Sequence, residues 1–171
     1  MIAASALAGM LWVAGLLPGL ATVDRIGVNT TVGVSTGLSL AGSHGVTYAR
    51  RSPAMLSFEV GLVHPHVPWL ELAPGILLEV EGRVALGLQA QARMYLTSTR
   101  FRPYAVVGVP AFVVPFTLLG AKAGGGVLAR LHDRFGIALE VGATVFFLGD
   151  DLMPRSALAK LDATLALRAN F

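Results

Sequence analysis

The chain has 171 residues, a length typical of one domain, and a formal net charge of +3. Apolar residues make up 54% of it and charged residues only 13%, with 20 glycines and no cysteine. The lack of cysteine excludes disulfides, thiol catalysis and cysteine metal sites. The few basic residues form no clustered run with interleaved aromatics, so we expect no nucleic-acid partner.

The first 23 residues carry no charge and are rich in alanine, leucine and glycine. This composition is typical of a secretory signal, although the usual basic start is missing, and small residues at Gly19 and Ala21 predict cleavage after Ala21. The alternative is a retained membrane-spanning helix, which needs about 20 apolar residues. We expect a signal peptide over 1–21 and one domain over 22–171.

From residue 25 onward, apolar and polar residues alternate with the period of a β-strand. Together with proline- and glycine-rich turns, this alternation predicts eight strands, over 25–40, 54–63, 69–80, 84–97, 104–114, 119–131, 134–148 and 158–171. A loop is expected over 42–52. The strand over 104–114 is apolar on both faces, so its register stays open.

A tight hairpin is expected around Gly82. An odd-length tip centred on this glycine keeps the faces of the two flanking strands matched. It places Glu71 opposite Arg93 as a cross-strand pair of opposite charge.

Along each predicted strand other than the one over 104–114, apolar residues occupy one set of alternate positions and polar residues the other; we call the second set the polar parity. All charged residues of the predicted strands fall on the polar parity, so one face of each strand is free of charge. A basic side chain at the lipid midplane costs about 2–4 kcal/mol, which explains such a face. A soluble barrel with a greasy interior fits less well, because eight strands enclose too little space for so many large apolar residues. We therefore predict an all-β fold, an eight-stranded antiparallel up-and-down transmembrane β-barrel with a charge-filled lumen.

Charged residues of the inward parity are expected to pair with one another and to plug the lumen. This predicted lumen ionic network comprises Glu59, Glu71, Glu79, Arg93, Lys122, Arg130, Glu140, Lys160, Asp162 and Arg168. Aromatic residues near strand ends are expected to form girdles at the membrane surfaces. The predicted girdle comprises Trp69, Tyr104, Phe135, Phe147 and Phe171.

Three features carry a resemblance to a known family: eight alternating segments over 25–171, a strand opening Arg102-Pro103-Tyr104, and a terminal alternation. That alternation comprises Leu165, Leu167, Ala169 and Phe171. The chain resembles the small eight-stranded barrels of Gram-negative bacteria, the outer-membrane protein A and X class. The resemblance implies location in the bacterial outer membrane, contact with its lipid, and recognition of Leu165, Leu167 and Phe171 by the insertion machinery. Ala169 departs from the family pattern, which prefers an aromatic residue there.

Two pairs of residues suggest binding or acid–base chemistry. His64 and His66 are spaced to share a face as metal ligands, but a proline-punctuated turn explains them better because spacing fixes no third ligand. Glu79 and Glu81 share a face, which would raise a carboxyl pKa; a rim ion cluster with the nearby Arg83 is the favoured interpretation. We expect no metal site and no cofactor.

Ser43 and His44 on the loop after the first strand suggest a hydrolase, with Asp150 and Asp151 as third-group candidates, but nothing in the sequence brings them together. We therefore expect a non-enzymatic monomer with a structural, adhesive or envelope-maintenance role and no catalytic residues. The alternatives are a barrel enzyme acting on lipid or peptide and a narrow pore for small solutes. A helical inner-membrane protein using 1–23 and 103–121 is disfavoured by the prolines in the second segment.

Overall fold

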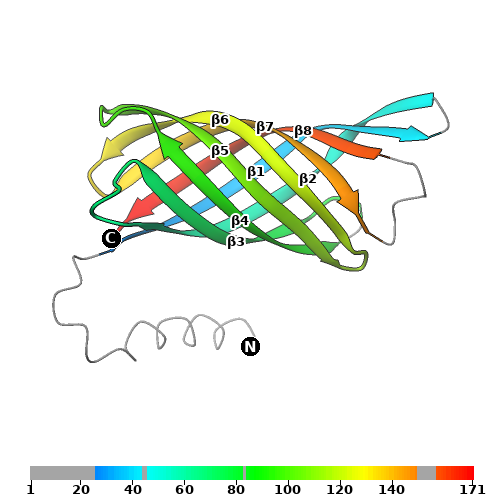
Figure 1. Ribbon diagram of the computed structural model, residues 1–171, viewed down its shortest axis with the longest axis horizontal. Coiled ribbons are helices and arrows are strands. Elements are labelled where there is room, and N and C mark those ends of the chain that lie inside the picture. The colour runs from blue at the N-terminus through cyan, green and yellow to red at the C-terminus, as the bar shows by residue number, and fades with distance from the viewer. Residues whose placement is uncertain (1–25, 44–45, 83, 150–156) are drawn as a thin grey trace, which may run out of the picture.

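The computed structural model describes residues 26–43, 46–82, 84–149 and 157–171. These residues form eight antiparallel strands that close into one barrel (Figure 1). The strands are β1 (Gly27–Ser43), β2 (Val46–Val63), β3 (Leu70–Glu79), β4 (Ala85–Tyr95), β5 (Phe101–Val114), β6 (Leu118–His132), β7 (Phe135–Leu148) and β8 (Ala157–Asn170). The predicted eight-stranded antiparallel barrel is therefore confirmed.

Each strand pairs with its neighbours in sequence, and the β1–β8 ladder closes the barrel, with Val32 opposite Leu167. Since the strand number is even, β1 begins and β8 ends at the same end of the barrel (Figure 1). We call this end the terminal rim; it also carries the turns 64–69, 96–100 and 133–134. The other end is the opposite rim. Within the described residues, no helix is long and apolar enough to cross a membrane.

Alternation along the strands sends large apolar side chains outward. Leu88, Val141 and Leu165 are 52%, 60% and 58% exposed, and similar residues cover every strand. Water-soluble proteins rarely expose a continuous apolar surface of this extent. A closed barrel also leaves no unpaired strand edge, as the hydrocarbon of a bilayer requires. The exterior is therefore suited to lipid.

The predicted loop over 42–52 is wrong, because β1 runs to Ser43 and β2 begins at Val46. A β-bulge explains the error. Ser35 pairs with Met55, whereas Gly37 pairs with Ser52, so β2 carries one extra residue between these positions. An extra residue reverses the parity of the strand on either side of it, which hides the alternation from a period-2 analysis.

The open register of the fifth strand is resolved by the structure. Tyr104, Val106 and Phe112 of β5 are buried inside the barrel, and Val107 and Val109 are about half exposed outside it, at 47% and 50%. The aromatic residues of β5 face glycines on neighbouring strands: Tyr104 pairs with Gly126 and Phe112 with Gly87. Those glycines leave the room that the inward rings fill.

Candidate functional site: the interior of the barrel

Arg93 lies at the centre of the interior, only 6% exposed, and is surrounded by carboxylates from three other strands. Its Nη1 lies 3.2 Å from Glu71 Oε1 and its Nε lies 3.5 Å from Glu140 Oε2. Its Nη2 pairs with Glu59 Oε2. The Glu71–Arg93 contact follows from the register, in which the two residues face each other across the β3–β4 hairpin as predicted.

Two further cations complete the group. Lys122 Nζ lies 2.6 Å from Glu140 Oε1, and Arg168 Nη1 lies 2.7 Å from Glu71 Oε2. We call these six residues the interior ion cluster: Glu59, Glu71, Arg93, Lys122, Glu140 and Arg168. It balances three acids with three bases, as burial in a region of low dielectric requires. The Arg168–Glu71 contact joins β8 to β3, and the Arg93–Glu140 contact joins β4 to β7. The cluster therefore links strands across the interior of the barrel.

Neutral side chains supply the remaining hydrogen bonds of the cluster. Tyr95 donates to Glu71 Oε2 and Tyr104 donates to Glu140 Oε2, both at 3.0 Å. Gln89 Nε2 donates to Glu59 Oε1 at 2.8 Å. With their oxygens paired in this way, the buried carboxylates resemble a structural network and not a site with a free acid or base.

Inward glycines make room for these long side chains. A Cβ on Gly126 would lie 2.7 Å from the ring and hydroxyl of Tyr104 and 2.5 Å from the carbonyl oxygen of Leu139. A Cβ on Gly75 would lie 2.8 Å from Glu59 Cγ. The tyrosine and the carboxylate therefore occupy space that only glycine leaves open.

Replacing Gly126 with alanine is expected to lower the free energy of unfolding by about 1–3 kcal/mol, because Tyr104 must move off Glu140. Gly125→Ala is the matched control. Its Cβ would meet only the Tyr104 carbonyl oxygen, at 3.2 Å, so a change within about 0.5 kcal/mol is expected. Urea unfolding in detergent, followed by tryptophan fluorescence, measures both. Equal effects would contradict the packing argument.

Lys160 and Asp162 lie beside the cluster, each 9% exposed. Lys160 Nζ contacts Met55 Sδ at 2.8 Å, and Asp162 Oδ1 has no hydrogen-bond partner among the described residues. Both residues line a cavity of about 60 Å³. A cavity of this size, lined by both polar and apolar side chains, has room for a few water molecules, since one water needs about 10–15 Å³.

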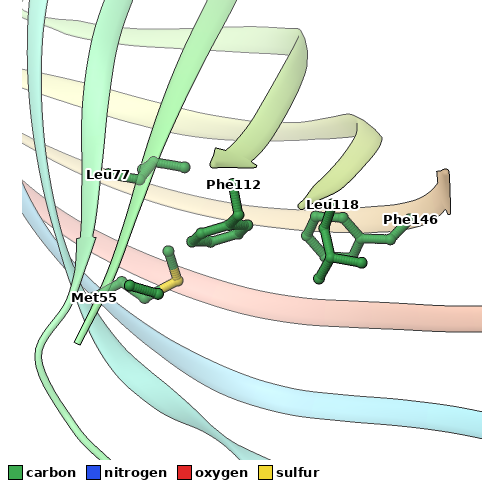
Figure 2. Close-up of a cluster of buried hydrophobic side chains, with 6 residues drawn as sticks. Met55, Leu77, Phe112, Leu118 and Phe146 are labelled. Carbon is green, nitrogen blue, oxygen red and sulfur yellow. The ribbon is translucent and has the colours of Figure 1, made fainter. Parts of the chain in front are cut away.

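The half of the interior toward the opposite rim holds an apolar layer beside the buried Lys160 and Ser52, so the predicted filling by charges describes only part of the lumen. Figure 2 shows Met55, Leu77, Phe112, Leu118 and Phe146 gathered there; with Ala85 these residues form the apolar layer. The rings of Phe112 and Phe146 lie 6.0 Å apart. Phe146 pairs across the sheet with Gly120, as Phe112 does with Gly87. An inward glycine opposite an aromatic residue is the sequence signal that could have revealed this layer.

Four residues of the predicted lumen ionic network lie outside the interior ion cluster: Lys160 and Asp162 are buried beside it, and Arg130 and Glu79 lie toward the two rims. Arg130 is exposed at the end of β6, because its position near the terminal rim carries it past the enclosed interior. Glu79 is half-buried at the end of β3, near the opposite rim. The other eight residues of the set are buried or nearly so inside the barrel.

The girdle prediction is wrong for Tyr104, which is 4% exposed and hydrogen-bonded to Glu140 in the interior. Its parity in β5 turns it inward, and this parity was hidden by the apolar residues on both faces. Trp69, Phe135, Phe147 and Phe171 are exposed on the outside, at 52%, 58%, 55% and 83%. The structure also places Leu165 and Leu167 on the outside of β8.

The residues that suggested catalysis or metal binding do not form a site in the described part of the chain. The rings of His64 and His66 lie 5.3 Å apart in the turn 64–69, and no metal-ligating group of three forms among the described residues. His44, Asp150 and Asp151 lie outside those residues, as does the side chain of Ser43.

Glu81 belongs to a rim ion pair. Its carboxylate accepts a hydrogen bond from the backbone N–H of Ala54 at 3.0 Å and pairs with Arg51 at 2.9 Å. The backbone hydrogen bond, followed by the charge of Arg51, holds the pKa of Glu81 below its usual value. A pKa of Glu81 raised by the neighbouring Glu79 is therefore not found. The observed partner of Glu81 is Arg51, and Arg83, the predicted partner, lies outside the described residues.

An apolar outer surface around a closed, ion-paired interior defines a transmembrane β-barrel. No protein-family model and no curated protein matches the chain. The crystal structure of Neisserial surface protein A (NspA) is similar, at 12% identity over 83% of this chain and 97% of that one, with a TM-score of 0.55. The N-terminal β-barrel domain of Pseudomonas aeruginosa OprF is similar at 12% identity over 82% and 97%, with a TM-score of 0.56. These likenesses establish the fold.

Proposed function

We propose that the chain is a non-enzymatic protein of the bacterial outer membrane with a structural, adhesive or envelope-maintenance role. The observation that carries this proposal is the filled interior. The interior ion cluster, with buried apolar residues such as Val106 and Leu128 beside it, lies toward the terminal rim. The apolar layer, with Lys160 in contact with Met55, lies toward the opposite rim. A pore needs a continuous water path lined by weak sites, and a cavity of about 60 Å³ is too small to supply one.

The outer-membrane location is supported by the exposed apolar residues of all eight strands and by the fold shared with solved outer-membrane barrels. Outward exposure of Leu165, Leu167 and Phe171 on the last strand makes them accessible to the insertion machinery, the partner that we propose for them. The closed ladder leaves no strand edge for a second copy, which favours a monomer.

Planar-bilayer recording tests the role. The purified protein is expected to give no stable unitary conductance, because the apolar layer and the ion cluster both block the axis. Phe112→Ala enlarges the interior, and Val107→Ala on the outside of the same strand is the matched control. A wild-type conductance that Phe112→Ala changes and Val107→Ala leaves unchanged would establish a pore and overturn the proposal.

The enzyme alternative is tested separately. If the barrel hydrolysed lipid or peptide through Ser43 and His44, His44→Ala would abolish turnover by the purified protein. We expect no turnover of either substrate class by the wild type. Turnover that His44→Ala removes would contradict the non-enzymatic role.

A further inference from the structure

Four arginines gather at the terminal rim, outside the interior ion cluster. Arg100 lies in the turn 96–100, Arg102 near the start of β5, Arg130 near the end of β6 and Arg134 in the turn 133–134. The two segments are in direct contact: Arg130 N donates to Arg100 O at 2.9 Å, and Arg100 Nε donates to Arg130 O at 3.2 Å. Three of the four are exposed, and Arg102 is half-buried. We call this group the arginine mouth.

The charge of the arginine mouth is not neutralised within the described residues. None of its members takes part in an ion pair there: the carboxylates of the interior ion cluster are held by Arg93, Lys122 and Arg168, and Glu81 is held by Arg51. Asp133 is the single acidic residue of the two turns, so the side chains of the four arginines and this aspartate sum to a charge of +3.

Arg102 of the arginine mouth faces the barrel axis and not the surrounding lipid. Arg102 pairs across the sheet with Leu128, which is 2% exposed, and shares its inward parity. The guanidinium of Arg102 lies 4.2 Å from the ring centroid of Tyr95, which is also buried inside. The lipid-facing positions beside these arginines carry Phe101 and Phe135, each about 60% exposed, at 62% and 58%. The outward positions next to Arg102 and Arg134 therefore carry aromatic rings, whereas Arg102 itself lies on the inward face.

We propose that the arginine mouth docks a carboxylate-bearing segment of a partner polypeptide on the periplasmic side. This inference rests on the proposed outer-membrane placement, which turns the rim with both chain ends toward the periplasm. Guanidinium groups bind carboxylates through two parallel hydrogen bonds, a geometry that a lysine patch would not provide. Tyr95 and Leu128 are buried, so the surface open to a ligand is formed by the exposed arginines of the two turns and of the end of β6. An extended acidic segment can contact several of these separated guanidinium groups, whereas a bare phosphate or an uncharged sugar suits them less well.

Binding to the full chain in nanodiscs of zwitterionic phosphatidylcholine tests the proposal. The probe is a fluorescein-labelled peptide of alternating glutamate and leucine, with glutamine in place of glutamate in the control peptide. Anisotropy titrations are expected to show tighter binding of the glutamate peptide, weakening as salt is added. The double variant Arg100→Gln/Arg134→Gln should weaken its binding about tenfold or more, since it removes two exposed charges from the complementary patch.

The matched control is Arg50→Gln/Arg51→Gln, which removes the same charge near the opposite rim and should leave the affinity unchanged. Equal losses in the two double variants would mean attraction to net charge alone and would overturn the proposal. So would absent peptide binding, or binding only of peptidoglycan fragments or phosphatidylglycerol vesicles. Heat-modifiable gel migration verifies that each variant is folded. Conductance of the wild-type protein in planar bilayers would contradict the proposed function. Absence of both conductance and peptide binding would contradict only the docking site.

Discussion

Replacing Arg93 with methionine is expected to lower the free energy of unfolding of the barrel by about 3–5 kcal/mol, the range for breaking a buried ion pair from one side. Arg93 is the central cation of the interior ion cluster, and Glu59, Glu71 and Glu140 all contact it. Methionine fills part of the space but leaves these three carboxylates without their shared partner. Urea unfolding in detergent micelles measures the loss.

The control for Arg93→Met is Arg51→Met. Arg51 also pairs with a glutamate, but its side chain is 65% exposed at the rim. Solvent and salt screen an exposed pair, so little measurable change is expected. Similar stabilities of the two variants would show that the interior ion cluster does not hold the walls of the barrel together.

Replacing Val141 with arginine is expected to destabilise the folded barrel by about 2–4 kcal/mol relative to the wild type, the cost of a basic residue at the lipid midplane. Val141 is 60% exposed on the outside of β7, midway between Phe135 and Phe147 at the two ends of that strand. Refolding into lipid vesicles over a range of urea concentrations measures this cost, because it depends on lipid surrounding the barrel.

Leu96→Arg is the matched control for Val141→Arg. Leu96 is 71% exposed but follows the last residue of β4, in the turn at the terminal rim. The same charge there can reach water and headgroups, so a cost of about 0–1 kcal/mol is expected. If both arginines were tolerated equally, the outside of the barrel would not be facing hydrocarbon.

Parity predicts the fold because burial in lipid acts on alternate residues. The hairpin around Gly82 illustrates this: the alternation of β3 and β4 and an odd-length tip together fix the register, and the structure has Glu71 opposite Arg93. No long-range information is needed, since both strands and their turn lie within 26 residues of sequence (70–95). The local pattern carries the whole prediction there.

Two parts of the fold depend on contacts that the local pattern does not encode. The bulge in β2 is an offset relative to β1, visible only when the two strands are aligned. In β5, valines and alanines suit either face, and the choice is made by the neighbours: Gly126 on β6 leaves space for Tyr104 on the inside. A period-2 analysis of one strand has no access to such complementarity.

The interior shows the same limit. Parity identifies which charged residues face inward, but the depth of a side chain depends on strand tilt and stagger. Arg130 and Lys122 share a face of β6, yet Arg130 is exposed near the rim and Lys122 is paired with Glu140. The apolar layer is likewise built from inward residues of six strands, β2 to β7, and becomes recognisable only when these strands are placed side by side.

The contact between Arg168 on β8 and Glu71 on β3 has a consequence for assembly. A sheet lacking its last strand would keep Glu71 and Arg93 on a face open to acyl chains, because only the closing β1–β8 ladder seals them from the hydrocarbon. Pairing of Glu71 with Arg168 and closure of the barrel therefore both depend on the same strand, β8. When β8 pairs with β1, the barrel closes and Arg168 reaches Glu71 in the same step. A partly inserted sheet without β8 is therefore an unfavourable intermediate of membrane insertion.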